Sequence, residues 1–201
     1  MIEIKTLKTN RLTLKKLSLK NLDDFFEWHK QEQYYVYLPT KPKTKAECKK
    51  YLKNKIKGYK NKTNQVLLWG IFFNDKLVGS VNISTLSFAH RCCEIGWGIS
   101  PTFHRQGIAY EAISEFIKYI FNDLNMNKIK IVYWKPNVAS GGLAKKLGFA
   151  NEGVERQARY KNNEYIDVIC CGLLKSEWEG KRGKDNGWFR ISYSNKKRFV
   201  V

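Results

Sequence analysis

The part of the chain best suited to chemistry is His104-Arg105-Gln106-Gly107-Ile108-Ala109, where a strand-like pattern gives way to a helical one. A loop that opens a helix presents unpaired backbone N–H groups and the positive end of the helix dipole, and both favour anions such as phosphates. Gly107 and Ala109 are small enough for the main chain to approach a pyrophosphate closely. Such loops often serve only as caps, so the loop alone indicates a phosphate site weakly.

The strand before this loop has two unlike faces. Its apolar face, which we expect to join the core, consists of Cys93, Ile95, Trp97 and Ile99. Its other face consists of Glu94, Gly96 and Gly98 and lacks the bulk of a packed interior. The pattern therefore predicts a ligand on the glycine face, with a carboxylate at one end.

The elements around this site follow from hydrophobic periodicity. The first third predicts a strand at 11–17, a helix after Ser18 and a second helix opened by the capping box Thr44-Lys45-Ala46-Glu47. The first helix is expected to bury Leu22, Phe25, Phe26 and His29. The second is expected to bury Ala46, Cys48, Tyr51, Leu52, Ile56 and Tyr59.

The rest of the chain predicts a sheet with further helices. A meander of three antiparallel strands spans 65–73, 76–86 and 91–100, with a turn at Asn74-Asp75. The elements after it are a helix at 107–121, a strand at 128–134, a helix from Asn137 to Gly148, and strands at 150–160 and 164–174 around Asn162-Asn163. This order predicts an α+β fold, a sheet with helices on its faces.

Composition excludes several classes of protein. The chain has 201 residues, of which 43% are hydrophobic, enough for one domain with a real core. No apolar run approaches the about 18 to 20 residues of a membrane-spanning helix. The residues from Met1 to Lys5 lead into a strand-like pattern without the apolar stretch of a secretory signal, so export is not expected. Cys48, Cys92-Cys93 and Cys170-Cys171 lack metal or disulfide spacing. We expect core cysteines in a cytoplasmic protein.

The charge is strongly positive, with 37 Lys and Arg against 18 Asp and Glu, a net charge of +19. Much of the excess lies between Lys41 and Lys62 and is almost entirely lysine. Nucleic-acid sites usually combine Arg with aromatic residues, a pattern absent from this segment. A solvated, lysine-rich helix is therefore the favoured interpretation.

Several motifs then occur in one consistent order. They are Glu94-Ile95-Gly96-Trp97-Gly98-Ile99, Arg105-Gln106-Gly107-Ile108-Ala109-Tyr110-Glu111-Ala112, Asn137-Val138-Ala139-Ser140, Leu147-Gly148-Phe149 and Asp167. With these motifs the chain resembles the GNAT acetyltransferase superfamily from about Thr9 to Trp178. Within it the chain most resembles the RimJ/RimL type of N-terminal acetyltransferases.

The resemblance implies a fold and a reaction. The expected sheet is mixed, mostly antiparallel and splayed into a V, with helices on both faces and acetyl-CoA in the cleft. A primary amine would attack the thioester directly. The resemblance implies pyrophosphate binding by the amides of Arg105, Gly107, Ala109 and Tyr110. It also implies pantetheine pairing at Trp97 and Ile99, and a thioester flanked by Asn137 and Ser140.

Three positions depart from the family pattern. His104 replaces a basic or glutamine residue, so only backbone contacts to phosphate are expected there. Ala144 occupies the position of the tyrosine that usually protonates the departing thiolate. Arg159 stands where the RimL-like branch tends to have a glutamate. The acid and base cannot simply be transferred from the family.

Aminolysis of a thioester needs a base for the ammonium and a proton or strong hydrogen bond for the sulfur. Glu94 is our candidate base, directly or through water, and its alternative is a strand carboxylate that pairs with Arg91 or Arg105 or is simply solvated. Ser140 is a candidate donor to the sulfur, although it also suits a helix cap. The alternative acids are Tyr133 and Tyr160, both equally suited to a core. Asp167 is expected to fix a turn or a neighbouring backbone group.

His29, His90 and His104 have no ligand spacing, so no metal is expected. The domain is expected to span residues 1–178, followed by a basic, aromatic extension at 179–201 that could add a strand, swap between subunits or stay loose.

The favoured function is acetyl-CoA-dependent N-acetylation of a primary amine, such as a protein N-terminal α-amine, with ribosome association as a further expectation. The alternatives are a small-molecule acetyltransferase for amino sugars, amino acids or antibiotics, and a catalytically weak acyl-CoA-binding module that docks to ribosome or RNA. No membrane partner is expected, and a monomer and a homodimer both remain open.

Overall fold

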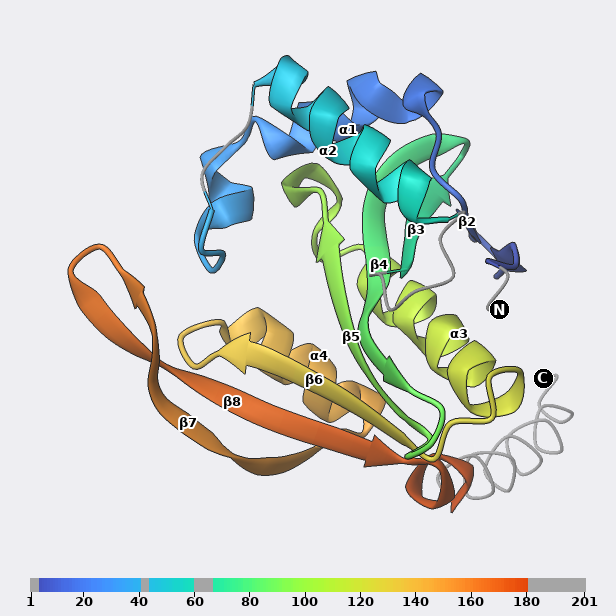
Figure 1. The fold of residues 1–201 in the computed structure, drawn as a ribbon, viewed down its shortest axis with the longest axis vertical. Coiled ribbons are helices and arrows are strands. Elements are labelled where there is room, and N and C mark those ends of the chain that lie inside the picture. Colours follow the sequence, from blue (N-terminus) through green and yellow to red (C-terminus); the bar gives the residue numbers. More distant parts are fainter. Residues whose placement is uncertain (1–3, 41–43, 60–66, 181–201) are drawn as a thin grey trace, which may run out of the picture.

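The computed structural model describes residues 4–40, 44–59 and 67–180. Its single sheet has eight strands in the order β1-β2-β3-β4-β5-β6-β8-β7 (Figure 1). The strands are β1 (Leu7–Lys8), β2 (Leu12–Lys15), β3 (Leu67–Phe73), β4 (Lys76–Ser87), β5 (Cys92–Ile99), β6 (Lys128–Trp134), β7 (Ala150–Lys161) and β8 (Glu164–Leu174). The α-helices are α1 (Leu22–His29), α2 (Lys45–Gly58), α3 (Ile108–Asn122) and α4 (Val138–Leu147).

Every strand and helix expected from the sequence is present, and β1 is an addition. The two predicted hairpin turns are also confirmed. Asn74 and Asp75 have φ of 48° and 59°, and Asn162 and Asn163 have φ of 52° and 62°. Two consecutive positive φ values in a two-residue loop are the geometry that matches the twist of antiparallel strands. Asparagine and aspartate tolerate that geometry, which is why the sequence could predict these turns.

The sheet splits between β5 and β6, the only parallel pair among the described strands. These strands pair only over Cys92–Glu94 and Lys128–Lys130. Beyond that point β5 stays with β4 up to Ile99, and β6 stays with β8 up to Trp134. The two halves of the sheet therefore diverge, as Figure 1 shows, and the predicted V is confirmed.

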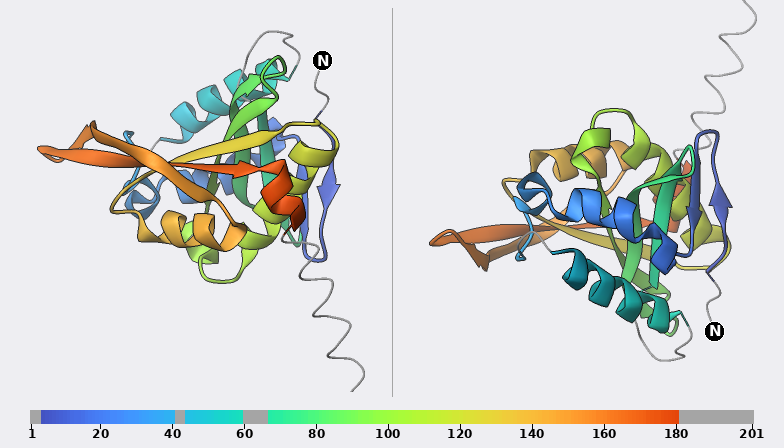
Figure 2. Two further views of the ribbon diagram at one scale, coloured as in Figure 1. Left: turned by 90° about the horizontal axis from the view of Figure 1, so that it is seen from below. Right: turned by 90° about the horizontal axis from the view of Figure 1, so that it is seen from above.

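Helices cover both faces of the sheet (Figure 2). Alternation along β3 divides the interior into two clusters. Leu68 and Phe72 pack with residues of α1 and α2 such as Phe25 and Leu52, and Trp69 faces α3. The larger cluster also includes Ala144 and Leu147 of α4, which places α3 and α4 opposite α1 and α2.

Some burial predictions were wrong in detail. Trp28 is fully buried although it was not among the predicted core residues, whereas Phe26 is half-buried. Ala46 and Tyr51 are exposed, because the lysine-rich α2 contacts the sheet along a narrower stripe than its spacing suggested. All five cysteines are free, as expected, but Cys92 and Cys170 are only half-buried.

The C-terminal part of the described chain forms a helix that packs on the domain. Residues 175–180 are helical, and Trp178 packs on Phe121 of α3 at 5.2 Å between ring centroids. Nearly all of the expected C-terminal extension falls in 181–201, outside the described residues. Within the described part of the chain, no helix combines the length and the apolarity needed to cross a membrane.

Candidate functional site

A cavity of about 530 Å³ occupies the gap where β5 and β6 diverge. Residues 95–98 of β5 and 131–134 of β6 form its sides. One end is lined from the α1 and α2 side, by Phe25, His29, Tyr34, Tyr35, residues 37–40 and Tyr51. The other end reaches Asn137 and Ser140 at the start of α4, on the opposite side of the sheet. The cavity therefore extends along the split from the α1 and α2 side of the sheet to the start of α4 on the other side.

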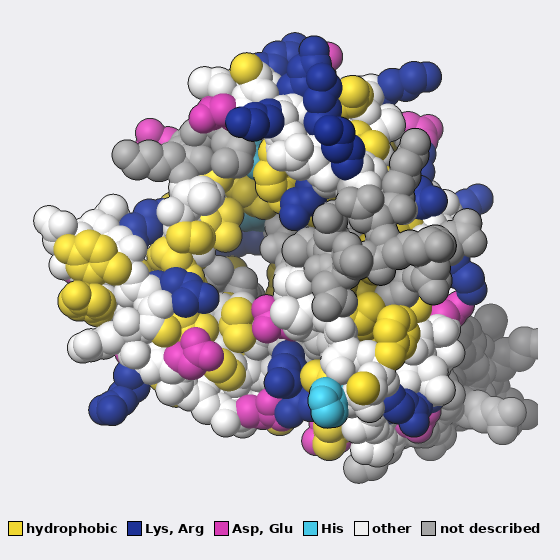
Figure 3. Space-filling view, in the orientation of Figure 1, with side chains coloured by type: hydrophobic (Ala, Val, Ile, Leu, Met, Phe, Trp, Pro, Cys, Tyr) yellow, Lys and Arg dark blue, Asp and Glu magenta, His cyan; other side chains and the backbone are white. Residues whose placement is uncertain are grey.

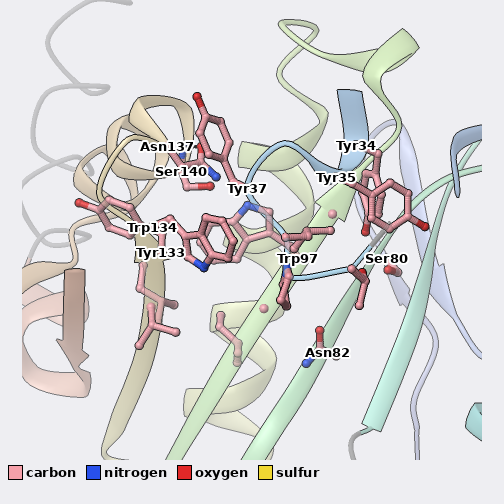
Figure 4. Close-up of a pocket in the computed structure, with 18 of the residues that line it drawn as sticks. Tyr34, Tyr35, Tyr37, Ser80, Asn82, Trp97, Tyr133, Trp134, Asn137 and Ser140 are labelled. Atoms are coloured by element: carbon pink, nitrogen blue, oxygen red, sulfur yellow. Dashed lines mark hydrogen bonds between the residues drawn. The ribbon is translucent and has the colours of Figure 1, made fainter. Parts of the chain in front are cut away.

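The figures show this arrangement directly. Figure 4 places Tyr133, Asn137 and Ser140 on one side of the cavity and Tyr34 and Tyr35 on the other, with Trp97 between them. In the space-filling view of Figure 3, the surface is hollowed between the β7–β8 hairpin and the body of the molecule.

The predicted phosphate loop has the backbone geometry of an anion site. Gly107 is the N-cap of α3 with φ of 77°, and Arg105 also has a positive φ of 60°. A glycine cap brings no side chain to the first-turn amides, so these N–H groups stay available to a ligand. The His104 ring also holds the loop, with Nε2 3.0 Å from the carbonyl oxygen of Ile99. These features are consistent with an anion that is bound by backbone amides. The sequence also predicted backbone binding, because His104 replaces a longer basic residue at this position.

Arg11 braces this loop, a role that we did not predict. Its Nη1 and Nη2 each donate to the carbonyl of Gln106 at 3.2 Å, and its Nε donates to Glu111 Oε2 at 2.7 Å. A Cβ at Gly107 would lie 3.4 Å from Arg11 Nη2. The guanidinium therefore brings a positive charge to the glycine itself. The sequence pattern around Arg11 indicated only a strand.

Glu111 completes the brace from the first turn of α3. Burial acts to raise the pKa of this carboxyl group, but hydrogen bonds from Thr9 and Arg11 and the Arg11 charge together lower it below its ordinary value. Thr9 Oγ1 donates to Glu111 Oε1 at 2.5 Å, and the Arg11 amide donates to the same oxygen at 3.0 Å. The carboxylate thus stays ionised and ties the first strands to the loop.

The predicted thioester end lies at the cavity. Trp97, Asn137 and Ser140 all line it. The Ser140 amide donates to Asn137 Oδ1 at 3.1 Å, so Asn137 also caps α4, as predicted. The other predicted acetyl-CoA residues do not line the cavity but lie along the end of β5 and the start of α3. They are Ile99, Arg105, Gly107, Ala109 and Tyr110.

Glu94 lies where β5 still pairs with β6, just before the residues of β5 that line the cavity. Its Oε1 accepts a hydrogen bond from Ser84 Oγ at 3.1 Å. It stands two residues before the cavity-lining Gly96, about 7 Å along a strand. Neither predicted ion pair, with Arg91 or with Arg105, is present among the described residues. Of the two routes considered, this position fits proton transfer through water better than direct contact.

The glycine face of β5 is less empty than expected. A Cβ at Gly98 would lie 2.9 Å from Cε2 of Tyr34, so this glycine makes room for a tyrosine ring. A Cβ at Gly96 would lie 3.2 Å from Oδ1 of the Asn82 amide. Tyr34 thus covers part of this face because the segment after α1 folds back over Gly98, yet Gly96 and Gly98 both line the cavity. The prediction that Trp97 joins the core was wrong, because its side chain is half-buried and lines the cavity.

Aromatic side chains dominate the end of the cavity near α1. Tyr35 is 3% exposed, and its hydroxyl has no hydrogen-bond partner among the described residues. Burial raises the pKa of Tyr34 and of Tyr35 above the ordinary value for tyrosine, so both phenols stay neutral. A buried hydroxyl without a partner is costly.

Lys161 at the end of β7 fixes the segment that carries these tyrosines. Its Nζ donates to the carbonyl oxygens of Tyr35 at 2.5 Å, Leu38 at 2.9 Å and Val36 at 3.2 Å. An ammonium group has three N–H donors, so this arrangement can use all of them. Lys161 thereby ties the hairpin β7–β8 to residues 35–38, which we call the roof of the cavity. Sequence periodicity gave no signal for this contact.

Of the two alternative acids, only Tyr133 lines the cavity. Its ring packs against Gly141, where a Cβ would lie 3.1 Å from the Tyr133 hydroxyl oxygen. Burial raises the pKa of Tyr133, which keeps its phenol protonated. Tyr160 is 59% exposed and its hydroxyl contacts Asn163 at 3.3 Å.

Two other expectations concern residues away from the cavity. Asp167 accepts from Lys135 Nζ at 3.1 Å and from the Gln157 amide at 3.0 Å, consistent with its predicted structural role. The described residues contain no group of three or more His, Cys, Asp or Glu that could hold a metal ion.

Comparisons with known proteins agree with the fold and the site described above. Residues 11–150 match the acetyltransferase (GNAT) domain family. The uncharacterized N-acetyltransferase YoaA of Bacillus subtilis is 38% identical over 109 residues, which is 53% of this chain and 62% of YoaA. The [ribosomal protein uS5]-alanine N-acetyltransferase of Escherichia coli is 24% identical over 121 residues, 59% of this chain and 62% of that protein. The chain thus covers under two thirds of these relatives.

Two further proteins widen the comparison. The spermidine N(1)-acetyltransferase of Vibrio cholerae is 28% identical over 102 residues, 51% of this chain and 59% of that protein. The solved structure of RimL, a ribosomal L7/L12 α-N-protein acetyltransferase in complex with coenzyme A, has the same fold. Its TM-score is 0.77 at 18% identity, with 85% of this chain and 98% of that one covered. The split sheet, the glycine-capped α3 and the family match over 11–150 lead to one conclusion: the chain belongs to the GNAT acetyltransferase family.

Proposed function

We propose that the protein transfers an acetyl group from acetyl-CoA to a primary amine. The observation that carries this proposal is the cavity that passes through the split between β5 and β6. Two substrates can enter it from opposite faces of the sheet and meet inside. Family membership supports the same reaction.

The residues along the split fit acetyl-CoA in an extended form. Its pyrophosphate would lie on the backbone amides of 105–110. There Gly107 has no side chain to block the ligand, and Arg11 places a positive charge beside it. Pantetheine would run along β5 at Trp97 and Ile99, beyond the last residue of β5 that pairs with β6. The thioester would then reach Asn137 and Ser140 in the cavity.

In this mechanism the neutral amine attacks the thioester carbon, and the tetrahedral intermediate collapses to an amide and a thiolate. Glu94 accepts the amine proton through water, since it stands two residues before the cavity-lining Gly96 on β5. The thiolate takes a proton or a hydrogen bond from Ser140 or Tyr133, the hydroxyl-bearing residues at the α4 end. Tyr133 would take over the role that Ala144, buried in the core, cannot perform.

We propose a protein N-terminal α-amine as the acceptor. Relatives named for ribosomal-protein acetylation support this class, and the relative named for spermidine supports a small-molecule alternative. Two features weigh against a polyamine. The chain has a net charge of +19, and among the described residues that line the cavity none has a carboxylate to bind a second ammonium.

Lysine side chains gather over α2, in the upper part of Figure 3. They support the further proposal that the enzyme associates with anionic ribosomal RNA near its substrates. An assay of CoA release tests the main proposal, with small-residue peptides and spermidine as acceptors. Release with peptides supports it, and release with spermidine alone would favour the small-molecule alternative.

A further inference from the structure

The cavity has an unexpected charge for a site that binds amines. Among its described lining residues, Arg159 is the one Lys or Arg, and none is Asp or Glu. His29 is buried, with Nδ1 2.8 Å from the Phe25 carbonyl oxygen. A guanidinium disfavours an ammonium nearby and favours the neutral amine, which is the reactive form. The cavity can therefore recognise the rest of the acceptor better through an anion than through a cation.

Arg159 is available for such an anion. Its Nη1 donates to the carbonyl of the preceding residue, Ala158, at 2.7 Å. No described carboxylate forms an ion pair with it, in contrast to Arg11, which is held by Glu111. The remaining N–H donors of the guanidinium lie in one plane and match both oxygens of a carboxylate.

The strand that carries Arg159 is fixed relative to the cavity. Arg159 pairs with Ile166, where the β7–β8 ladder resumes after the irregular segment that contains Gln157. Two residues later, on the same face of β7, Lys161 binds three carbonyls of the cavity roof. Arg159 is thus held at the rim instead of moving with a free hairpin.

We propose that the acceptor carries a carboxylate close to its reactive amine, as in a peptide whose second residue is Asp or Glu, and that Arg159 binds this carboxylate at the cavity rim. The inference rests on the proposed acetyl transfer and narrows its acceptor class. The cavity wall between the two groups consists largely of aromatic side chains, which leave room for a short peptide backbone.

Three amidated peptides test this specificity, Ser-Asp-Ala, Ser-Asn-Ala and Ser-Lys-Ala, with CoA release as the readout. Asp and Asn have the same shape, so their comparison isolates the charge. We expect kcat/KM to be about tenfold higher for the Asp peptide than for the Asn peptide, and lowest for the Lys peptide. Arg159→Gln should remove the preference, and Arg159→Lys should retain part of it.

Arg156→Gln is the matched control, because it removes the same charge from the same strand outside the cavity lining. Calorimetry measures the affinity of acetylated Ser-Asp-Ala amide for the enzyme in the presence of CoA, a binding that involves no turnover. Arg159→Gln should weaken this affinity about tenfold. Equal use of the three peptides, or equal effects of Arg156→Gln and Arg159→Gln, would overturn the inference. If no amine releases CoA, acetyl transfer fails as a function, and the calorimetric comparison alone decides the role of Arg159.

Discussion

Arg11 and Glu111 lie 100 residues apart and meet as an ion pair, with 2.7 Å between Nε and Oε2, beside the loop that begins α3. The same guanidinium donates to the Gln106 carbonyl within that loop. The turn between β1 and β2, which carries Arg11, therefore holds the proposed pyrophosphate site in shape. This long-range contact makes the position of the loop depend on the first residues of the domain.

Replacing Arg11 should weaken acetyl-CoA binding. Arg11→Gln removes the ion pair and a positive charge next to Gly107, and we expect the Kd for acetyl-CoA to rise about tenfold. Isothermal calorimetry gives the value directly. Lys16→Gln, which removes one charge from an exposed neighbouring position, should leave the Kd nearly unchanged. Equal affinity in wild type and Arg11→Gln would show that the brace has no part in binding.

Glu111 should make stability depend on pH. Its pKa is lowered in the folded state from an ordinary value of 4.5, because hydrogen bonds from Thr9 and Arg11 outweigh burial. The stabilisation is complete above the unfolded pKa and is lost as pH falls through the lowered folded pKa. Urea unfolding between about pH 7 and pH 3 should show a steeper loss of stability for wild type than for Glu111→Gln. Parallel curves would contradict this.

Gly107→Val should impair acetyl-CoA binding while the fold survives. The position has φ of 77°, which valine adopts with strain, and a Cβ would meet Arg11 Nη2 at 3.4 Å. We expect a loss of about 2 kcal/mol or more in calorimetric binding. Gly142→Val is the control, since a Cβ there meets nothing within 4 Å. Similar affinities for the two variants would remove the phosphate cradle from the mechanism.

Glu94→Gln tests the proposed base. We expect kcat to fall about 10²-fold, because the amine proton loses its acceptor, while acetyl-CoA affinity stays nearly the same. The decline of wild-type kcat toward acid pH should disappear in this variant. Ser84→Ala removes the hydrogen bond to Glu94 Oε1 but keeps the carboxylate, so it should cost much less. Turnover of Glu94→Gln at the wild-type rate would place the base elsewhere, or leave the proton to water.

Tyr133→Phe tests the proton donor at the α4 end of the cavity. Because burial raises the pKa of Tyr133, its phenol stays protonated and no alkaline loss of rate should come from it below about pH 10. We expect kcat to fall about tenfold in Tyr133→Phe and in Ser140→Ala if each donates to the sulfur. Tyr160→Phe changes an exposed tyrosine outside the cavity lining and should have no effect. Wild-type kcat in both cavity variants would assign the proton to solvent.

Local patterns were enough to predict most of the fold. The capping box at Thr44, the Asn74-Asp75 turn and the Gly148 cap are each set by residues within one turn of chain, and all three are present. Alternation also placed Glu94 and Gly96 on one face of β5. What periodicity could not supply was the depth of burial, as for Tyr51, because burial depends on how the facing elements pack.

The site was harder to predict where it depends on distant contacts. Arg11 and Lys161 act on segments about a hundred residues away, and neither shows a spacing that would indicate this. Tyr34 covers Gly98 because the chain turns back after α1, a path that no local pattern encodes. The resemblance to a family supplied the positions of Asn137 and Ser140, and the structure adds that they line one cavity with Trp97.

The most direct test of the proposed reaction is an initial-rate assay of CoA release in which acetyl-CoA and the amidated Ser-Asp-Ala peptide are both varied. If the two substrates meet in the split between β5 and β6, turnover requires both to be bound at once. We then expect intersecting double-reciprocal lines, an acetyl group on the peptide α-amine by mass spectrometry and no acetylated enzyme. Parallel lines with an acetylated enzyme, or no CoA release with any amine, would contradict direct transfer in this cavity.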